Sequence, residues 1–323
     1  MSDKRVSETA FETVIEAHLL AAGYTAVDGH AFDRERAIFP EEALAFIRTT
    51  QPQIWSKLEA LHGEQTGPRV LEALCKWLDS YGALATLRHG FKCFGKTLRI
   101  AFFRPAHGLN PELEARYQAN RVGLTRQLHF SPRSEQSLDV VLSVNGIPVV
   151  TLELKNPLTG QTVKHAIHQY RQDRAPREPI FVFTKRSVVH FAVDTEEAHM
   201  TTRLAGSSTH FLPFNKGFKG NAGNPPDPEG EEADVGLPAS LGHGSKDAFQ
   251  CCALFLFCHL LGFVAKICTP KYAFEFGGCF ARLGAVSLIN DHRILAGGQM
   301  ILPSLAALLI ELGQLLAHKG KFL

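Results

Sequence analysis

Two apolar runs separated by Asn145-Gly146 constrain the fold more than any other feature of this chain. Residues 139–144 and 147–154 are rich in valine, leucine and isoleucine, and apolar side chains alternate along both runs. This alternation is typical of half-buried strands, and Asn-Gly is the strongest short signal for a tight turn between two strands. The segment therefore predicts a β-hairpin with one face in a core.

The polar residues of the hairpin decide which register the two strands take. Glu153 and Lys155 are two residues apart in the second strand, so their side chains share a face. A two-residue turn in unbroken register would pair Asp139 with Leu152, on the opposite face from Glu153. A three-residue loop at 145–147, or a bulge, pairs Asp139 with Glu153 and also brings the two apolar sets together. We therefore predict a bulged or three-residue loop.

An acid on one strand and Glu-x-Lys on the next form the minimal apparatus for metal-dependent phosphodiester cleavage. Two carboxylates can hold Mg²⁺ between them, and the ion then polarises a phosphate and activates a water. A nearby ammonium can orient that water or offset developing charge. The same three residues also suit an ordinary hairpin with solvated charges on its outer face, so the context has to decide.

Composition leaves most function classes open. The chain has 323 residues and a net charge of only +2, which does not mark the whole molecule as a nucleic-acid binder. Basic residues do gather on both sides of the hairpin, at Arg99, Arg104, Arg116, Arg121, Arg126 and Arg133 before it and at Lys164, Arg171, Arg174, Arg177, Lys185 and Arg186 after it. Such a surface could bind phosphates, although scattered arginines are more often solvated or paired. The N-terminus has no signal-peptide pattern, and seven cysteines without a regular framework predict a cytoplasmic protein.

Hydrophobic periodicity predicts helices first and then strands with an inserted helix. Helices are expected at residues 11–19, 40–48, 52–61, 69–81 and 162–172, and strands at 98–103, 125–130, 180–183 and 188–193 besides the hairpin. This order predicts an α/β or α+β fold with a central mixed β-sheet flanked by helices.

Residues 90–97 match the phosphate-binding loop pattern G-x-x-x-x-G-K-[ST] letter for letter. That loop needs a helix after it, with the helix N-terminus aimed at the phosphates. Here Lys96 and Thr97 run directly into a strand pattern, and Phe91 and Phe94 would crowd a loop that wraps phosphates. We interpret the segment as a β-turn into a strand and expect no ATP site here.

The chain resembles the N-terminal nuclease domain of type I restriction endonuclease R subunits, which are PD-(D/E)xK nucleases. The likeness spans about residues 6–228 and lies in Phe11-Glu12, Thr50-Gln51-Pro52, Trp55, Leu87-Arg88-His89-Gly90, Gln127-Leu128-His129-Phe130, Ser137-Leu138-Asp139, Glu153-Leu154-Lys155-Asn156-Pro157 and His168-Gln169-Tyr170-Arg171. These motifs together are much more specific than the two acids and the lysine alone. The resemblance implies a restriction-endonuclease-like fold.

The resemblance also implies roles for individual residues. It implies that Asp139 and Glu153 bind Mg²⁺, that Lys155 assists the attacking water, and that Gln169 and Tyr170 contact the site or DNA. The family carries a Q-x-x-x-Y signature on the helix after the hairpin, whereas Gln169 and Tyr170 are adjacent in this chain. Glu12 on the first helix could supply a further acid, but we expect a solvated helix position.

The implied function is that of a Mg²⁺-dependent DNA endonuclease domain in a type I restriction-modification system. Its implied partners are DNA and the methyltransferase and specificity subunits, and ATP is expected only for the motor domains that follow this domain in the family. The alternatives are a non-catalytic truncated R-subunit remnant that binds DNA or partner subunits, and a nucleotide-binding protein that uses residues 90–97.

The sequence changes character after the nuclease-like part. We expect a nuclease domain at 1–214, a linker at 215–236 rich in Gly, Pro, Asn, Asp and Glu, and an unassigned apolar, cysteine-rich tail at 237–323. The tail has three interpretations: a helical cap on the nuclease, a membrane segment at 248–268, or a stretch translated in a shifted frame. We favour the third and expect no membrane association, because resemblance and composition change at the same place and 248–268 contains several polar residues. Cys251, Cys252, Cys258 and His259 fit no common zinc spacing.

Overall fold

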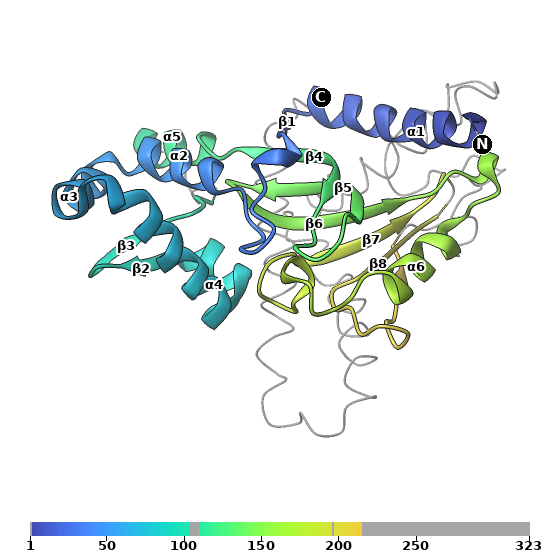
Figure 1. Cartoon of the computed structure of the whole chain (residues 1–323). Helices are drawn as coiled ribbons and strands as arrows, with labels where there is room; N and C mark the ends of the chain where they lie inside the picture. Colours follow the sequence, from blue (N-terminus) through green and yellow to red (C-terminus); the bar gives the residue numbers. More distant parts are fainter. Residues whose placement is uncertain (1, 104–109, 196, 215–323) are drawn as a thin grey trace, which may run out of the picture.

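A mixed β-sheet forms the centre of the protein, as Figure 1 shows. The structure, a computed structural model, describes residues 2–103, 110–195 and 197–214. Within these residues the sheet consists of β1 (Thr25–Ala26), β4 (Val122–His129), β5 (Ser137–Val144), β6 (Ile147–Leu154), β7 (Val189–Val193), β8 (Ala198–Thr201) and β9 (Leu212–Pro213), in that spatial order. The β1–β4 and β6–β7 pairs are parallel and the other neighbours are antiparallel, which confirms the expected α/β class and mixed sheet.

Helices flank the sheet on both faces. The helices are α1 (Ser2–Ala21), α2 (Pro40–Thr50), α3 (Pro52–His62), α4 (Thr66–His89), α5 (Pro111–Gln118) and α6 (Val163–Gln172), with the 3₁₀ turns η1 (Gly29–Ala31), η2 (Gly63–Gln65), η3 (Pro157–Thr159) and η4 (Pro179–Phe181). The expected helices are confirmed, and α4 extends further than predicted at both ends. In Figure 1, α2, α3, α4 and α5 gather at one end of the sheet, away from α1 and α6.

The two apolar cores show which helix covers which face. Leu19 of α1 belongs to the same core as Val140, whereas Ala166 of α6 belongs to the core that contains Val141. Successive residues of a strand point to opposite faces of the sheet. The helices α1 and α6 therefore pack on opposite faces, as the view in Figure 1 also shows.

The hairpin of β5 and β6 closes with a two-residue turn. Val144 pairs with Ile147, and Asn145 and Gly146 between them have φ values of 48° and 84°. Two central residues with positive φ match the twist of the flanking strands. Glycine is required at the second position, because a Cβ there would lie 2.5 Å from the Phe39 carbonyl oxygen.

A bulge follows the turn and sets the register of the hairpin. Ser143 pairs with Pro148, but Leu142 pairs with Val150, so Val149 is an extra residue in β6. The predicted bulge is confirmed, and the alternative of a three-residue loop is wrong. Beyond the bulge the register is the one that sets residue 139 opposite residue 153.

The strand predicted over residues 98–103 is wrong beyond the end of the short strand β3 (Lys96–Leu98). Side-chain amides satisfy the backbone of this run in place of a neighbouring strand. Gln51 donates from Nε2 to the Arg99 carbonyl and accepts the Arg99 N–H at Oε1, both at 2.8 Å. Asn120 does the same for Phe102, at 2.6 Å and 3.2 Å. With these groups paired, the segment does not need a neighbouring strand to satisfy its backbone.

The strand predicted at 180–183 is also wrong, because Ile180 and Phe181 lie in the 3₁₀ turn η4, which begins at Pro179. Both side chains are buried, and the Phe181 ring lies 5.0 Å from the ring of Phe130. A short apolar run has the same sequence pattern in a strand and in a buried turn, so hydrophobic periodicity could not distinguish the two.

Residues 90–97 fold as a hairpin and not as a phosphate-binding loop. The strand β2 (Phe91–Cys93) pairs antiparallel with β3, and Phe94 and Gly95 form the turn. Lys96 begins a strand, so no helix N-terminus is available to hold a phosphate at this place. The interpretation as a turn into a strand is confirmed.

Replacing Lys96 with alanine is therefore expected to leave the response to ATP unchanged. The side chain is exposed on the hairpin and has no role in a phosphate site. Equilibrium binding of a fluorescent ATP analogue to both chains checks this. Binding that is present in the unaltered chain and lost in the variant would restore the phosphate-loop interpretation.

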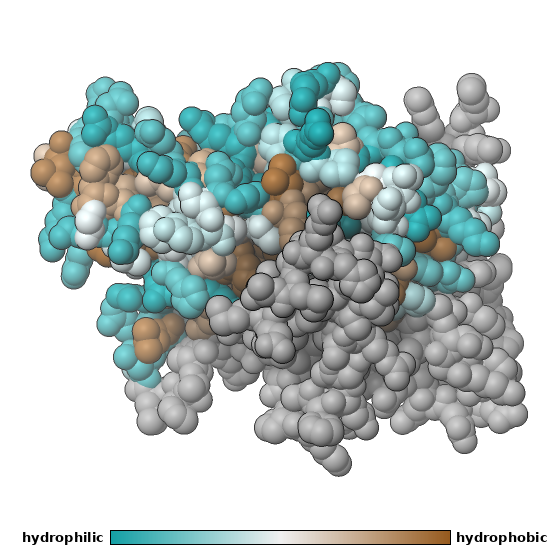
Figure 2. Space-filling model, turned by 90° about the horizontal axis from the view of Figure 1, so that it is seen from below, coloured by the Kyte–Doolittle hydropathy of each residue, from teal (hydrophilic) through white to brown (hydrophobic). Residues whose placement is uncertain are grey.

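Figure 2 shows one face of the molecule, mostly hydrophilic over the described residues, with apolar patches in separate places. Among the described residues, the large apolar side chains exposed to solvent are those of Leu20, Leu61, Tyr81, Phe94, Leu113 and Phe183. In the part of the chain that the structure describes, no helix combines the length and apolar character needed to cross a bilayer. The expected linker at 215–236 and the tail at 237–323, with its membrane alternative and its Cys/His group, lie outside the described residues.

Candidate active site

The fold brings Asp139, Glu153 and Lys155 together where β5 begins and β6 ends. Val140 pairs with Leu152, so the same register sets Asp139 opposite Glu153 on the neighbouring strand. The Lys155 Nζ lies 4.0 Å from the Asp139 Oδ2, which also accepts the Leu154 N–H at 2.7 Å. The three side chains are mostly buried, with Asp139 16% and Lys155 12% exposed and Glu153 fully enclosed. The grouping expected from the hairpin pattern is the one that the structure has.

Glu153 is a buried carboxyl group with a raised pKa and one oxygen that has no hydrogen-bond partner. Its Oε1 accepts a hydrogen bond from the Arg174 Nε at 2.7 Å, while its Oε2 is buried without any hydrogen-bond partner. Burial and then the charge of Asp139 raise the pKa of Glu153 to about 8, against the opposing effects of Arg174 and Lys155. A buried oxygen without a donor is costly, so this one is suited to a cation.

The chemistry of these donors fits Mg²⁺. The ion is bound in many proteins through one or two carboxylates and completes its coordination with water and substrate phosphate. Asp139 and Glu153 provide two carboxylates, and the orphaned Oε2 of Glu153 provides a buried oxygen in need of a positive partner. Among the described residues no group of three or more His, Cys, Asp or Glu side chains is placed to hold a metal ion.

Arg174 is a residue of the site that the sequence did not reveal. It follows the C-terminal end of α6 and is buried, with its Nη2 donating to the Ser137 carbonyl at 2.8 Å and its guanidinium 5.4 Å from the centre of the Phe130 ring. In the sequence it is one of several basic residues after the hairpin. Nothing in the local pattern distinguishes a buried partner of Glu153 from a solvated arginine.

Tyr170 and Gln169 take different positions although they are adjacent. Tyr170 is fully buried under the sheet, and its hydroxyl lies 2.8 Å from the Thr151 Oγ1. Burial, followed by the charge of Glu153, raises the pKa of Tyr170. Neighbours on a helix point about 100° apart, and Gln169 is half-buried without a described hydrogen bond to Asp139, Glu153 or Lys155. Tyr170 thus lies beside the site, and contact of Gln169 with DNA stays a prediction.

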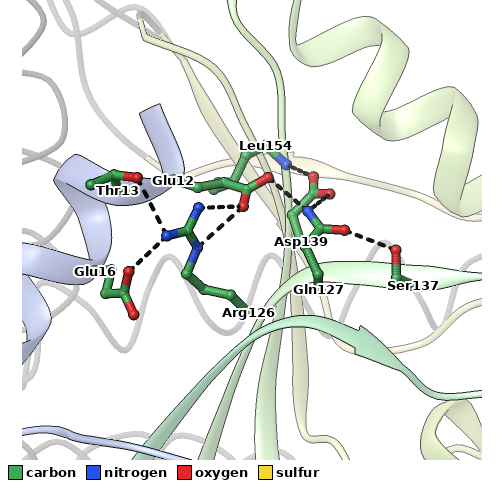
Figure 3. A network of polar contacts seen from close by, with 8 residues as sticks. All are labelled: Glu12, Thr13, Glu16, Arg126, Gln127, Ser137, Asp139 and Leu154. Carbon is green, nitrogen blue, oxygen red and sulfur yellow. Dashed lines mark hydrogen bonds and ion pairs between the residues drawn. The ribbon is translucent and has the colours of Figure 1, made fainter. Parts of the chain in front are cut away.

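Glu12 does not occupy the solvated helix position that we expected. Its side chain is 9% exposed, its Oε2 accepts two hydrogen bonds from Arg126 at 3.0 Å and 3.2 Å, and its Oε1 accepts one from the Gln127 Nε2 at 2.7 Å. Burial is the main cause that raises its pKa, and the charge of Asp139 adds to it. Figure 3 shows Glu12 and Asp139 on either side of the Gln127 amide. The α1 helix therefore reaches the site through a buried acid.

Many of the basic residues around the hairpin are paired with acids. These pairs are Arg116 with Glu112, Arg121 with Glu42, Arg126 with Glu12 and Glu16, Arg133 with Glu178, Arg174 with Glu153, and Arg186 with Asp79. An arginine already bound to a carboxylate has less charge to offer a phosphate. The sequence count of basic residues thus overstates the surface that could bind DNA.

No curated protein and no solved structure matches the chain. A family model does match: the one described as the type I restriction enzyme R protein N terminus aligns with residues 5–209, well over half of the chain. The match covers every residue of the site described above. The chain belongs to the family of type I restriction enzyme R protein N-terminal regions.

Proposed function

We propose that this chain is a Mg²⁺-dependent DNA endonuclease domain that hydrolyses phosphodiester bonds within a type I restriction system. Family membership ties the chain to restriction systems and supports a nuclease. The observation that carries the proposal is the buried, unpartnered Oε2 of Glu153, next to Asp139 and within the same site as Lys155. Two neighbouring acids that can hold an ion and a nearby ammonium suit metal-dependent hydrolysis.

Each residue of the site has a defined task in this proposal. Asp139 and Glu153 hold the ion, which when bound polarises the scissile phosphate and lowers the pKa of an attacking water. Lys155, whose Nζ lies 4.0 Å from the Asp139 Oδ2, orients that water for in-line attack and offsets charge that develops on the phosphate. Arg174 occupies one oxygen of Glu153 and so leaves the other oxygen for the ion.

The proposed setting follows from the family. We take the partners to be DNA and the methyltransferase and specificity subunits of a restriction complex, with the reaction in the cytoplasm. Cys75 and Cys93 are free thiols, in keeping with a reducing compartment. ATP belongs to the motor domains of the family and has no part in the chemistry proposed for this chain.

Cleavage of a supercoiled plasmid tests the proposal. The unaltered chain with Mg²⁺, alone or with its partner subunits, is expected to cut, and Lys155→Ala to cut about 10²-fold more slowly because a group that stabilises the transition state is removed. Lys57→Ala, an exposed lysine on α3, is the control and is expected to cut normally. Equal cutting by Lys155→Ala and the unaltered chain would contradict the proposal, and DNA binding without cutting would favour the non-catalytic alternative.

A further inference from the structure

Gln127 adopts a backbone conformation that its place in the sheet does not require. Its φ is 46°, although its neighbours Arg126 and Leu128 pair with Val140 and Leu138 of β5 in one continuous register. A non-glycine residue at positive φ inside a strand is strained, and such strain is concentrated at functional sites and ligand clamps. The contacts of the side chain give the reason for this conformation.

The Gln127 amide lies between two carboxylates that belong to different elements. Its Nε2 donates to the Glu12 Oε1 of α1 at 2.7 Å and approaches the Asp139 Oδ1 of β5 at 3.4 Å, as Figure 3 shows. Its Oε1 accepts the Ser137 hydroxyl at 2.9 Å. With the oxygen held by Ser137, both N–H groups are directed at the acids.

Glu12 is fully engaged and serves as an anchor for this amide. Arg126 donates twice to its Oε2 and also reaches Glu16 at 2.7 Å, so the guanidinium is fixed between two acids of α1. The remaining oxygen of Glu12 takes the Gln127 amide. The α1 helix thus fixes the Gln127 amide through Glu12. Of the two acids beside this amide, Asp139 is the one that would bind the ion.

Asp139 is held on both of its oxygens. The Leu154 N–H donates to Oδ2 at 2.7 Å, and the Gln127 amide lies on the side of Oδ1. A ligand carboxylate fixed by its supporting hydrogen bonds loses less freedom when it binds a metal. An amide can fix it without adding the positive charge that a guanidinium would bring, so the attraction for a cation is retained.

We propose that Gln127 is a positioning residue of the metal site, and that its strained backbone exists to aim its amide at Asp139 with Glu12 as the anchor. The inference rests on the proposed function, because it assigns Gln127 a task at the Asp139 ligand. Ser137 shares the task through its hydrogen bond to the amide oxygen.

The test separates positioning from mere support of the fold by following thermal stability and Mg²⁺ response in the whole chain. Gln127→Gly removes the amide but suits the positive φ, so the metal-free chain is expected to stay folded, with a melting temperature lowered by the loss of the hydrogen bond to Glu12. Its Mg²⁺ half-saturation, read from the metal-induced rise in melting temperature without DNA, is expected to increase about 10–100-fold. Gln127→Leu keeps a similar bulk without N–H donors or added charge, and it is expected to lose a similar part of the Mg²⁺ response.

Phe94→Gly is the matched control, because Phe94 has the same φ of 46° at the tip of the β2–β3 hairpin, outside the site. It is expected to bind Mg²⁺ as the unaltered chain does. A Gln127→Gly chain that melts at a lower temperature and binds Mg²⁺ normally would overturn the inference and leave the proposed function standing. An unaltered chain that neither gains stability with Mg²⁺ nor cuts DNA would overturn both.

Discussion

A Glu153→Gln chain is expected to keep its fold and to cut DNA about a thousand times more slowly than the unaltered chain. Glutamine has nearly the same shape, and its amide oxygen can still accept the hydrogen bond from Arg174. It lacks the negative charge that would hold the ion. Loss of a charged ligand removes several kcal/mol of transition-state stabilisation, and about 4 kcal/mol corresponds to about 10³-fold in rate.

The expected stability of this variant makes the experiment decisive. Because the pKa of Glu153 is about 8, the metal-free chain at neutral pH already favours the neutral acid, which glutamine imitates. Thermal unfolding monitored by circular dichroism is therefore expected to be unchanged, whereas plasmid cleavage at saturating Mg²⁺ is expected to be slowed. Glu178→Gln is the control, since Glu178 is another largely buried carboxyl with an arginine nearby, 3.7 Å from Arg133. Cleavage by Glu153→Gln at the normal rate would remove Glu153 from the mechanism.

The metal-free chain is expected to lose about 2 kcal/mol of stability between pH 6.5 and pH 8. Burial and the charge of Asp139 raise the pKa of Glu153 from 4.5 to about 8, so in this range the folded state keeps a proton that the unfolded state has released. The unfolded state then binds fewer protons, and the free energy of unfolding falls by about 1.4 kcal/mol per pH unit. The contribution is complete below pH 4.5 and is lost as the pH rises through 8.

Between pH 6.5 and pH 8 the titration of buried His190, which has the opposite effect on stability, does not contribute. Burial lowers the pKa of His190 from 6.5 to about 3, so His190 makes stability rise with pH only below 6.5. Urea unfolding with EDTA at pH 6.5 and pH 8 measures the loss, and Glu153→Gln should flatten it. A loss of equal size in that variant would assign the effect to other groups.

Mg²⁺ binding is expected to tighten as the pH rises, because the ion competes with the proton on Glu153. An ion that binds the carboxylate displaces the proton, so its half-saturation should fall as the pH rises, by at most about tenfold per pH unit. Titrations of the melting temperature with Mg²⁺ at the two pH values give this slope. A half-saturation that is independent of pH would show that Glu153 is already ionised when the ion arrives.

The sequence contained enough information to predict the hairpin and its register. The alternation of apolar residues on both sides of Asn145-Gly146 allows only one register that buries both apolar sets, and the same register aligns Asp139 with Glu153. Two independent demands that agree on one geometry make a strong prediction. The structure meets them through a bulge at Val149.

The supporting residues could not be found in the same way. Glu12, Gln127 and Arg174 reach the site from α1, β4 and the segment after α6, and their roles depend on packing between elements far apart in sequence. A polar residue on a helix or strand edge has the same local pattern whether it faces water or a buried carboxylate. The wrong strand at 98–103 has a similar origin, because the Gln51 and Asn120 amides take the place of a sheet partner.

The contact between Arg174 and Glu153 has a consequence for ion selectivity. With Oε1 accepting the hydrogen bond from Arg174, Oε2 is the carboxylate oxygen left without a partner, so the proposed site would favour monodentate coordination by Glu153. Larger ions such as Ca²⁺ gain from bidentate carboxylates and high coordination numbers, whereas Mg²⁺ requires a compact octahedron that retains several waters. Under the proposed function, a buried arginine would thereby favour the smaller ion without touching it.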